Sequence, residues 1–69
     1  MERYRITTQE NGVEQTWVLL PDRPSAVIQA EELSQRNKTL HVRVYHEVSA
    51  TPPEWSKELA LDLPPKSPA

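Results

Sequence analysis

The chain has 69 residues, enough for one domain, and a domain of this size buries only roughly 60% of the surface that its unfolded chain exposes. It contains no cysteine, which excludes disulfides, thiolate catalysis and cysteine-based zinc sites and fits a reducing, cytoplasmic location. The formal net charge of −2 produces no strong field toward nucleic acid. No apolar run approaches the roughly 20 residues of a membrane span, so we expect a soluble, unprocessed chain with no membrane partner.

Residues 3–9 alternate in polarity, and a second strand, residues 13–20, is expected after the dipeptide Asn11-Gly12. Both of these residues tolerate the positive φ of a type I′ turn, so the pattern predicts a β-hairpin. Directly opposed residues of a hairpin share a face. We therefore expect one apolar face, with Tyr4 opposite Leu19 and Ile6 opposite Trp17.

A helix of about three turns is expected next. The segment Pro21 to Pro24 ends the second strand, and Ser25 is placed to cap a helix with its hydroxyl. Asn37 is a residue type that often ends a helix. Between them, small and apolar residues recur on the side that we expect to face the sheet: Ala26, Val27, Ala30 and Leu33.

Residues 39–48 alternate strictly between apolar and polar side chains, which is typical of a half-buried strand. A right-handed crossover makes this third strand parallel to the second. Beside the first strand it would be antiparallel, in the order 2-1-3, which we prefer, although 1-2-3 stays open. The predicted fold class is α+β: a small β-β-α-β domain over residues 1–48, with a three-stranded sheet and one helix on one face.

Residues 49–69 form a separate C-terminal segment that contains five of the seven prolines. Thr51 to Glu54 matches a capping box, and Trp55, Leu59 and Leu63 recur every four residues. These signals predict a short helix at about residues 52–61, followed by a disordered, Pro-rich tail. Such a helix is too short to hold in water alone, so it must dock on another surface.

The expected core is thin for the number of apolar side chains that need cover. It comprises eleven residues: Tyr4, Ile6, Val13, Trp17, Leu19, Val27, Ala30, Leu33, Leu40, Val42 and Val44. Five more remain uncovered: Val18, Leu20, Tyr45, Trp55 and Leu59. Burial of these side chains contributes several kcal/mol at about 25 cal/mol per Å². The cover could come from the chain's own C-terminal segment, a second copy or a larger partner.

The face of the sheet turned away from the helix is expected to carry Arg3, Arg5, Arg43 and Tyr45. Basic residues beside an aromatic ring are typical of surfaces that stack single-stranded nucleic acid. Only one aromatic residue is expected there, however, and Glu47 shares the face and can form a solvated ion pair with Arg3 or Arg5. An ordinary balanced outer face and a protein-contact surface are the other interpretations.

Catalytic and metal-binding patterns are missing from the sequence. His41 and His46 are five residues apart and project to opposite faces of a strand, so they cannot share a metal ion. A single glycine allows no phosphate-binding loop or dinucleotide motif. Glu31 and Glu32 are adjacent on the helix and diverge, which gives no paired carboxylates. We therefore expect no enzyme activity, no cofactor and no metal.

The function predicted from the sequence is that of a small non-enzymatic interaction module, a regulatory or accessory protein that binds another protein or a second copy of itself. We expect the contact to use the open sheet face, the Trp55 segment or both, through Arg3, Arg5, Val18, Arg43, Tyr45, Trp55 and Leu59. The alternative is a single-stranded nucleic-acid-binding module that uses Arg3, Arg5, Arg43 and Tyr45, although the net charge disfavours nucleic acid as the partner.

Overall fold

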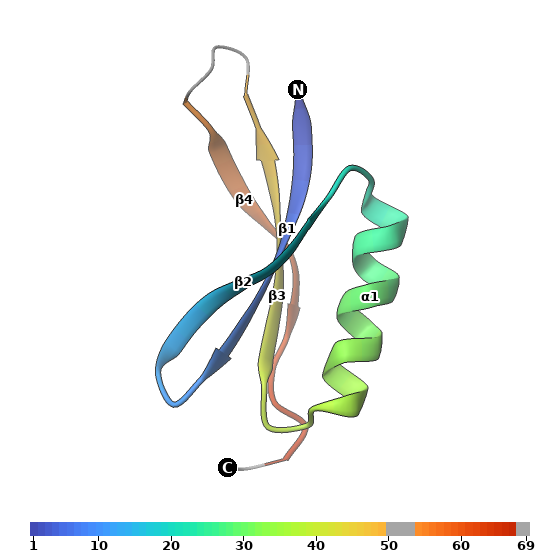
Figure 1. Ribbon diagram of the computed structural model, residues 1–69, viewed down its shortest axis with the longest axis vertical. Coiled ribbons are helices and arrows are strands. Elements are labelled where there is room, and N and C mark those ends of the chain that lie inside the picture. Colours follow the sequence, from blue (N-terminus) through green and yellow to red (C-terminus); the bar gives the residue numbers. More distant parts are fainter. Residues whose placement is uncertain (50–53, 68–69) are drawn as a thin grey trace.

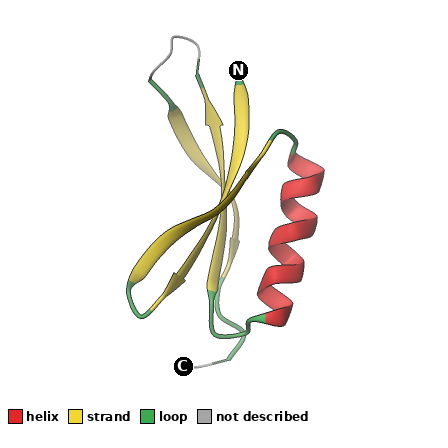
Figure 2. Cartoon of the chain, in the orientation of Figure 1, coloured by secondary structure: helices red, strands yellow, loops and turns green. Residues whose placement is uncertain are grey.

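A computed structural model describes residues 1–49 and 54–67 of the chain. In this part of the chain, one antiparallel sheet has the strand order β2-β1-β3-β4, and one helix covers one of its faces (Figures 1 and 2). The elements in chain order are β1 (Glu2–Glu10), β2 (Val13–Leu20), α1 (Arg23–Arg36), β3 (His41–Val48) and β4 (Ser56–Leu63). The α+β class is confirmed, but the sheet has four strands in place of the three that we predicted.

The β1–β2 hairpin turns at Asn11 and Gly12, whose φ angles of 55° and 80° confirm the predicted turn residues. Its register follows the prediction from the turn as far as Thr7, which pairs with Thr16. A β-bulge then leaves Trp17 without an opposite residue, and Ile6 pairs with Val18. The one-residue shift changes the face of everything that follows in β2.

This bulge makes part of the predicted core wrong. Val18 and Leu20 pack against the core, whereas Trp17 is 58% exposed and Leu19 is 44% exposed. Val13 was also expected in the core and is 58% exposed. It lies at the turn end of the hairpin, which extends away from α1 (Figure 1) and so has no layer to pack against.

Helix α1 begins earlier than predicted, because Asp22 and not Ser25 is its N-cap. The Asp22 carboxylate accepts a hydrogen bond of 2.9 Å from the Ser25 backbone N–H, a group that has no partner within the helix. Asn37 ends the helix as expected, and its N–H donates to the Leu33 carbonyl at 3.0 Å. The helix buries Ala26, Ala30 and Ser34, and these small side chains let it approach the sheet closely.

The core lies between α1 and the two central strands. Strand β3 pairs antiparallel with β1, which confirms the predicted order 2-1-3 for the first three strands. The Tyr4 ring stacks on His46 with 4.7 Å between centroids. The buried apolar side chains are Tyr4, Ile6, Ala26, Ala30, Val42 and Val44.

The C-terminal helix predicted at about residues 52–61 is wrong for the residues that the structure describes, because Ser56–Leu63 form β4 along the free edge of β3. The expected cap at Thr51 lies outside the described residues, as do Pro52 and Pro53. A strand satisfies the backbone of β3 as well as its own, which an isolated short helix cannot do. A bulge at Ala60 turns Ala60, Leu61 and Leu63 toward the core.

The residues after β4 also contact the domain. The backbone N–H groups of Lys66 and Ser67 donate to the Lys38 carbonyl at 2.8 and 3.0 Å. The prediction of a disordered tail is therefore wrong for residues 64–67, while residues 68 and 69 lie outside the described part of the chain. Strand β4 and these contacts complete the sheet that residues 1–48 begin.

Candidate functional site

The candidate site is the face of the sheet that α1 leaves uncovered, which we call the open face. The pairing of β1 with β3 places Arg3 opposite Glu47, Arg5 opposite Tyr45, and Thr7 opposite Arg43. Because opposed residues share a face, four predicted contact residues come together there. They are Arg3, Arg5, Arg43 and Tyr45.

Glu47 is the centre of an ion-pair cluster on this face. It is only 4% exposed, and its carboxylate accepts hydrogen bonds from Arg3 Nε at 2.6 Å and Arg5 Nε at 2.8 Å. The hydrogen bond from Arg5 and then that from Arg3 lower the pKa of Glu47, against the opposite effect of burial. The solvated pair predicted from the sequence is thus a buried carboxylate held by two guanidinium groups.

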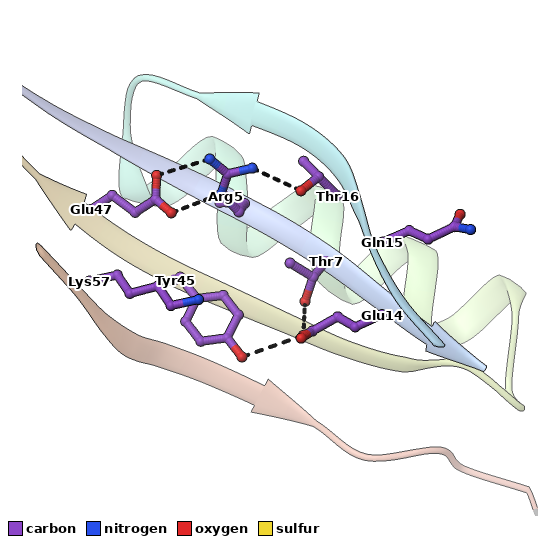
Figure 3. A pocket seen from close by; sticks show the side chains of 8 residues that line it. All are labelled: Arg5, Thr7, Glu14, Gln15, Thr16, Tyr45, Glu47 and Lys57. Atoms are coloured by element: carbon purple, nitrogen blue, oxygen red, sulfur yellow. Dashed lines mark hydrogen bonds and ion pairs between the residues drawn. The ribbon is translucent and has the colours of Figure 1, made fainter. Parts of the chain in front are cut away.

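A second carboxylate, Glu14 of β2, anchors the other half of the open face (Figure 3). It accepts a hydrogen bond of 2.8 Å from the Thr7 hydroxyl and a longer one of 3.4 Å from the Tyr45 hydroxyl. Arg43 Nη1 lies 3.5 Å from the same carboxylate oxygen. The Thr7 hydrogen bond, and after it the charge of Arg43, lower the pKa of Glu14.

Strand β4 adds a third carboxylate. Asp62 contacts His41 Nε2 and lies 3.4 Å from Arg43 Nε. The hydrogen bond with His41 and the charge of Arg43 lower the pKa of Asp62. Each of the three arginines on the open face therefore has at least one carboxylate partner.

Each of two aromatic rings on this face has a cationic side chain above it. The Arg3 guanidinium lies 3.7 Å from the centre of a Trp55 ring, and Lys57 Nζ lies 4.5 Å from that of Tyr45. Leu59 is opposite Tyr45 and 52% exposed. Between these groups the face is hollowed by an open depression of about 310 Å³, lined by Arg5, Thr7, Glu14, Gln15, Thr16, Tyr45, Glu47 and Lys57 (Figure 3).

One of the predicted contact residues lies elsewhere. The bulge turns Val18 toward the core, so it shares no surface with the other six. The sequence analysis also missed two residues of the open face, Lys57 and Asp62, because it placed them on or after a helix. Leu61 and Leu63 flank the polar Asp62, and this short alternation was a period-two signal that could have revealed a strand.

The two histidines are on opposite faces of β3, as predicted. His41 is on the open face, while His46 stacks on Tyr4 and its Nε2 lies 2.8 Å from a Glu2 carboxylate oxygen. Among residues 1–49 and 54–67, no group of three or more His, Cys, Asp or Glu side chains is placed to hold a metal ion. In the same residues, no helix has both the length and the apolar character needed to cross a membrane.

Comparison with known proteins gives no relative from which a function could be transferred: no protein-family model, no curated protein and no solved structure matches this chain. The interpretation of the open face therefore depends on its own geometry.

Proposed function

We propose that the protein is a small, non-enzymatic interaction module, a regulatory or accessory protein that binds another protein through the open face. The observation that carries this proposal is the pairing of Arg3, Arg5 and Arg43 with carboxylates of the same face. The result is a broad, uncovered surface whose charges are already balanced. Protein interfaces have this character, with a polar rim around a few aromatic and apolar anchors.

The same pairing argues against phosphate as the natural ligand. A guanidinium binds phosphate best when its N–H donors are free for bidentate contact. On the open face, Arg5 already donates to both Glu47 and Thr16, at 2.8 Å in each case. Nucleic acid would have to displace Glu47 from between two arginines and leave a buried carboxylate without partners.

The anchors that we propose are Tyr45, Trp55 and Leu59. The two rings are held by the cations of Lys57 and Arg3, so they lose little freedom when a partner covers them. Leu59 adds an exposed aliphatic side chain next to Tyr45. Tyr45 and Leu59 project from hydrogen-bonded strands of the sheet, so this part of the binding surface is preorganised.

A quantitative capture experiment tests this proposal. The full chain, immobilised, is compared with Leu59→Lys on the open face and with Ile28→Lys on the outer side of α1. The wild-type residues are 52% and 58% exposed, so both variants should fold. We expect at least one protein from the source cell to bind both the wild type and Ile28→Lys. The amount of that protein captured by Leu59→Lys should be at least tenfold lower.

Two results would contradict the proposal. One is a set of captured proteins that is the same for Leu59→Lys and the wild type. The other is binding of a labelled single-stranded oligonucleotide, measured by fluorescence anisotropy, whose affinity falls steeply with salt as counterion release requires. The second result would establish the nucleic-acid alternative.

A further inference from the structure

A second surface, independent of the open face, lies between the edge strand β2 and helix α1. Trp17 and Ile28 are each 58% exposed, and Leu33, which packs against the core, lines the same groove. Together they form an open groove of about 530 Å³, which also has a polar rim. The lining residues are Trp17, Ile28, Gln29, Glu32, Leu33, Arg36 and Asn37.

The exposure of Trp17 is a direct consequence of the β2 bulge. A regular strand would have placed Trp17 opposite Ile6, but the bulge pairs Ile6 with Val18 and leaves Trp17 unpaired at the sheet edge. The largest side chain of β2 therefore forms one wall of the groove. Trp17 and Ile28 thus place two large exposed apolar side chains in one groove, and exposed apolar groups of this kind are found on association surfaces.

The two edges of the sheet differ in how they are protected against further pairing. Edge strand β4 carries Lys57, Glu58 and Asp62 and is followed by Pro64-Pro65, which are common devices against edge association. Edge strand β2 contains neither lysine nor proline, and its one charged residue, Glu14, is engaged on the open face. Its bulge is the one such device that β2 has.

We propose that this groove and the adjacent β2 edge bind a second copy of this chain. In a two-fold arrangement, the Trp17 of each copy can insert into the groove of the other, because the same side chain forms part of both surfaces. The charges permit this contact: β2 brings no free charge, and the groove carries one carboxylate, Glu32, and one guanidinium, Arg36. Two identical grooves therefore do not repel each other.

The area that a stable dimer needs defines how far the contact extends. Specific interfaces bury about 800 Å² on each partner, which is about a sixth of the 4654 Å² exposed by one copy. A groove alone does not supply this area, so the contact must continue along β2 toward Val13, which is also exposed.

The test is the oligomeric state of the full chain, measured by sedimentation equilibrium over a wide range of concentration. We expect a reversible dimer of the 7.9 kDa chain. We expect Trp17→Lys and Ile28→Lys each to weaken dimerisation at least tenfold, and Leu59→Lys to leave it unchanged. Weaker dimerisation of Ile28→Lys cannot be explained by a misfolded sheet, because Ile28 is exposed on a helix and is not part of the sheet.

A second readout reports on Trp17 itself. In Trp55→Phe, Trp17 is the only tryptophan, and its fluorescence emission should move to shorter wavelength as the concentration rises through the dimerisation range. A chain that stays monomeric at every concentration would overturn the proposal. So would a dimer that both Trp17→Lys and Ile28→Lys leave intact, since association would then use another surface.

Discussion

At the scale of single residues, the most consequential group is Glu47. The sequence places it on the outer face of an alternating strand, where a carboxylate normally points into water. The structure buries it to 4% exposure because Arg3 and Arg5 come from the neighbouring strand to meet it. A buried carboxylate with two charged donors stabilises the fold only while both partners remain.

Replacement of this carboxylate tests that conclusion. We expect Glu47→Gln to reduce the free energy of unfolding by about 1–3 kcal/mol, because two partly buried guanidinium groups lose their counter-ion. Urea denaturation followed by circular dichroism measures the change. The matched control is Glu58→Gln on β4, whose side chain is 78% exposed and should change the free energy by less than about 0.5 kcal/mol. Equal effects of the two substitutions would contradict the assignment.

The lowered pKa of Glu47 predicts a dependence of stability on pH. In the unfolded chain the pKa of Glu47 returns to about 4.5. At a pH between this value and the lower pKa of the folded state, the Glu47 carboxyl binds more protons in the unfolded state than in the folded state. The contribution of Glu47 is therefore complete above about pH 4.5 and is lost as the pH falls through the folded pKa. Glu14 and Asp62, whose pKa values are also lowered, act in the same direction.

Urea midpoints measured from neutral to acidic pH check this prediction. The wild-type midpoint should be constant at higher pH and fall below about pH 4.5, and Glu47→Gln should show a shallower fall. An identical acid profile for the two proteins would show that Glu47 titrates normally in the folded state.

At the scale of elements, local signals correctly predicted type and order where they were unambiguous. The Asn11-Gly12 turn and the alternating β3 segment formed as predicted. The prediction of element type failed at residues 56–63, where two patterns overlapped: Leu59 and Leu63 fit a helix by their four-residue spacing, yet with Leu61 they also fit a strand. The free edge of β3 decides this competition, because it offers hydrogen bonds that only a strand can use.

The start of α1 provides an element-scale prediction. Asp22→Ala removes the acceptor for the Ser25 N–H and should destabilise the protein by about 1 kcal/mol, as measured by urea denaturation. Ser25→Ala is the matched control, because the structure uses the Ser25 backbone and not its hydroxyl as the capping group. A larger effect at Ser25 than at Asp22 would restore the cap predicted from the sequence.

At the scale of the whole molecule, the C-terminal segment supplies apolar side chains that cover part of the core. Ala60, Leu61 and Leu63 of β4 pack against the core, and Trp55 covers Arg3. The molecule thus supplies its own fourth strand, while α1 covers only one face of the sheet (Figure 2). Among the described residues, Leu59 stays exposed on the open face, and Trp17 and Ile28 stay exposed in the groove.

Truncation tests the contribution of β4 to the whole. We expect a chain that ends at Ser49 to lose cooperative unfolding, because Val42 and Val44 lose their neighbours and β3 becomes an unprotected edge. Thermal denaturation followed by circular dichroism detects this change. A chain that ends at Leu63 keeps β4, loses the hydrogen bonds that Lys66 and Ser67 donate to Lys38, and should still unfold cooperatively. Cooperative unfolding of the shorter chain would show that β4 is dispensable.

The sequence by itself determined the local structure of this protein: the turn at Asn11-Gly12, a helix that ends at Asn37, the alternation of β3 and the positions of Arg3, Arg5, Arg43 and Tyr45 on one face. These features depend on backbone propensity and on a period of two or 3.6 residues, both of which are local. Only the tertiary structure decided the bulge at Trp17, the burial of Glu47 and the strand at residues 56–63. Each of these depends on how neighbouring elements pack and pair in detail, which local patterns do not specify even where they predict the right neighbour.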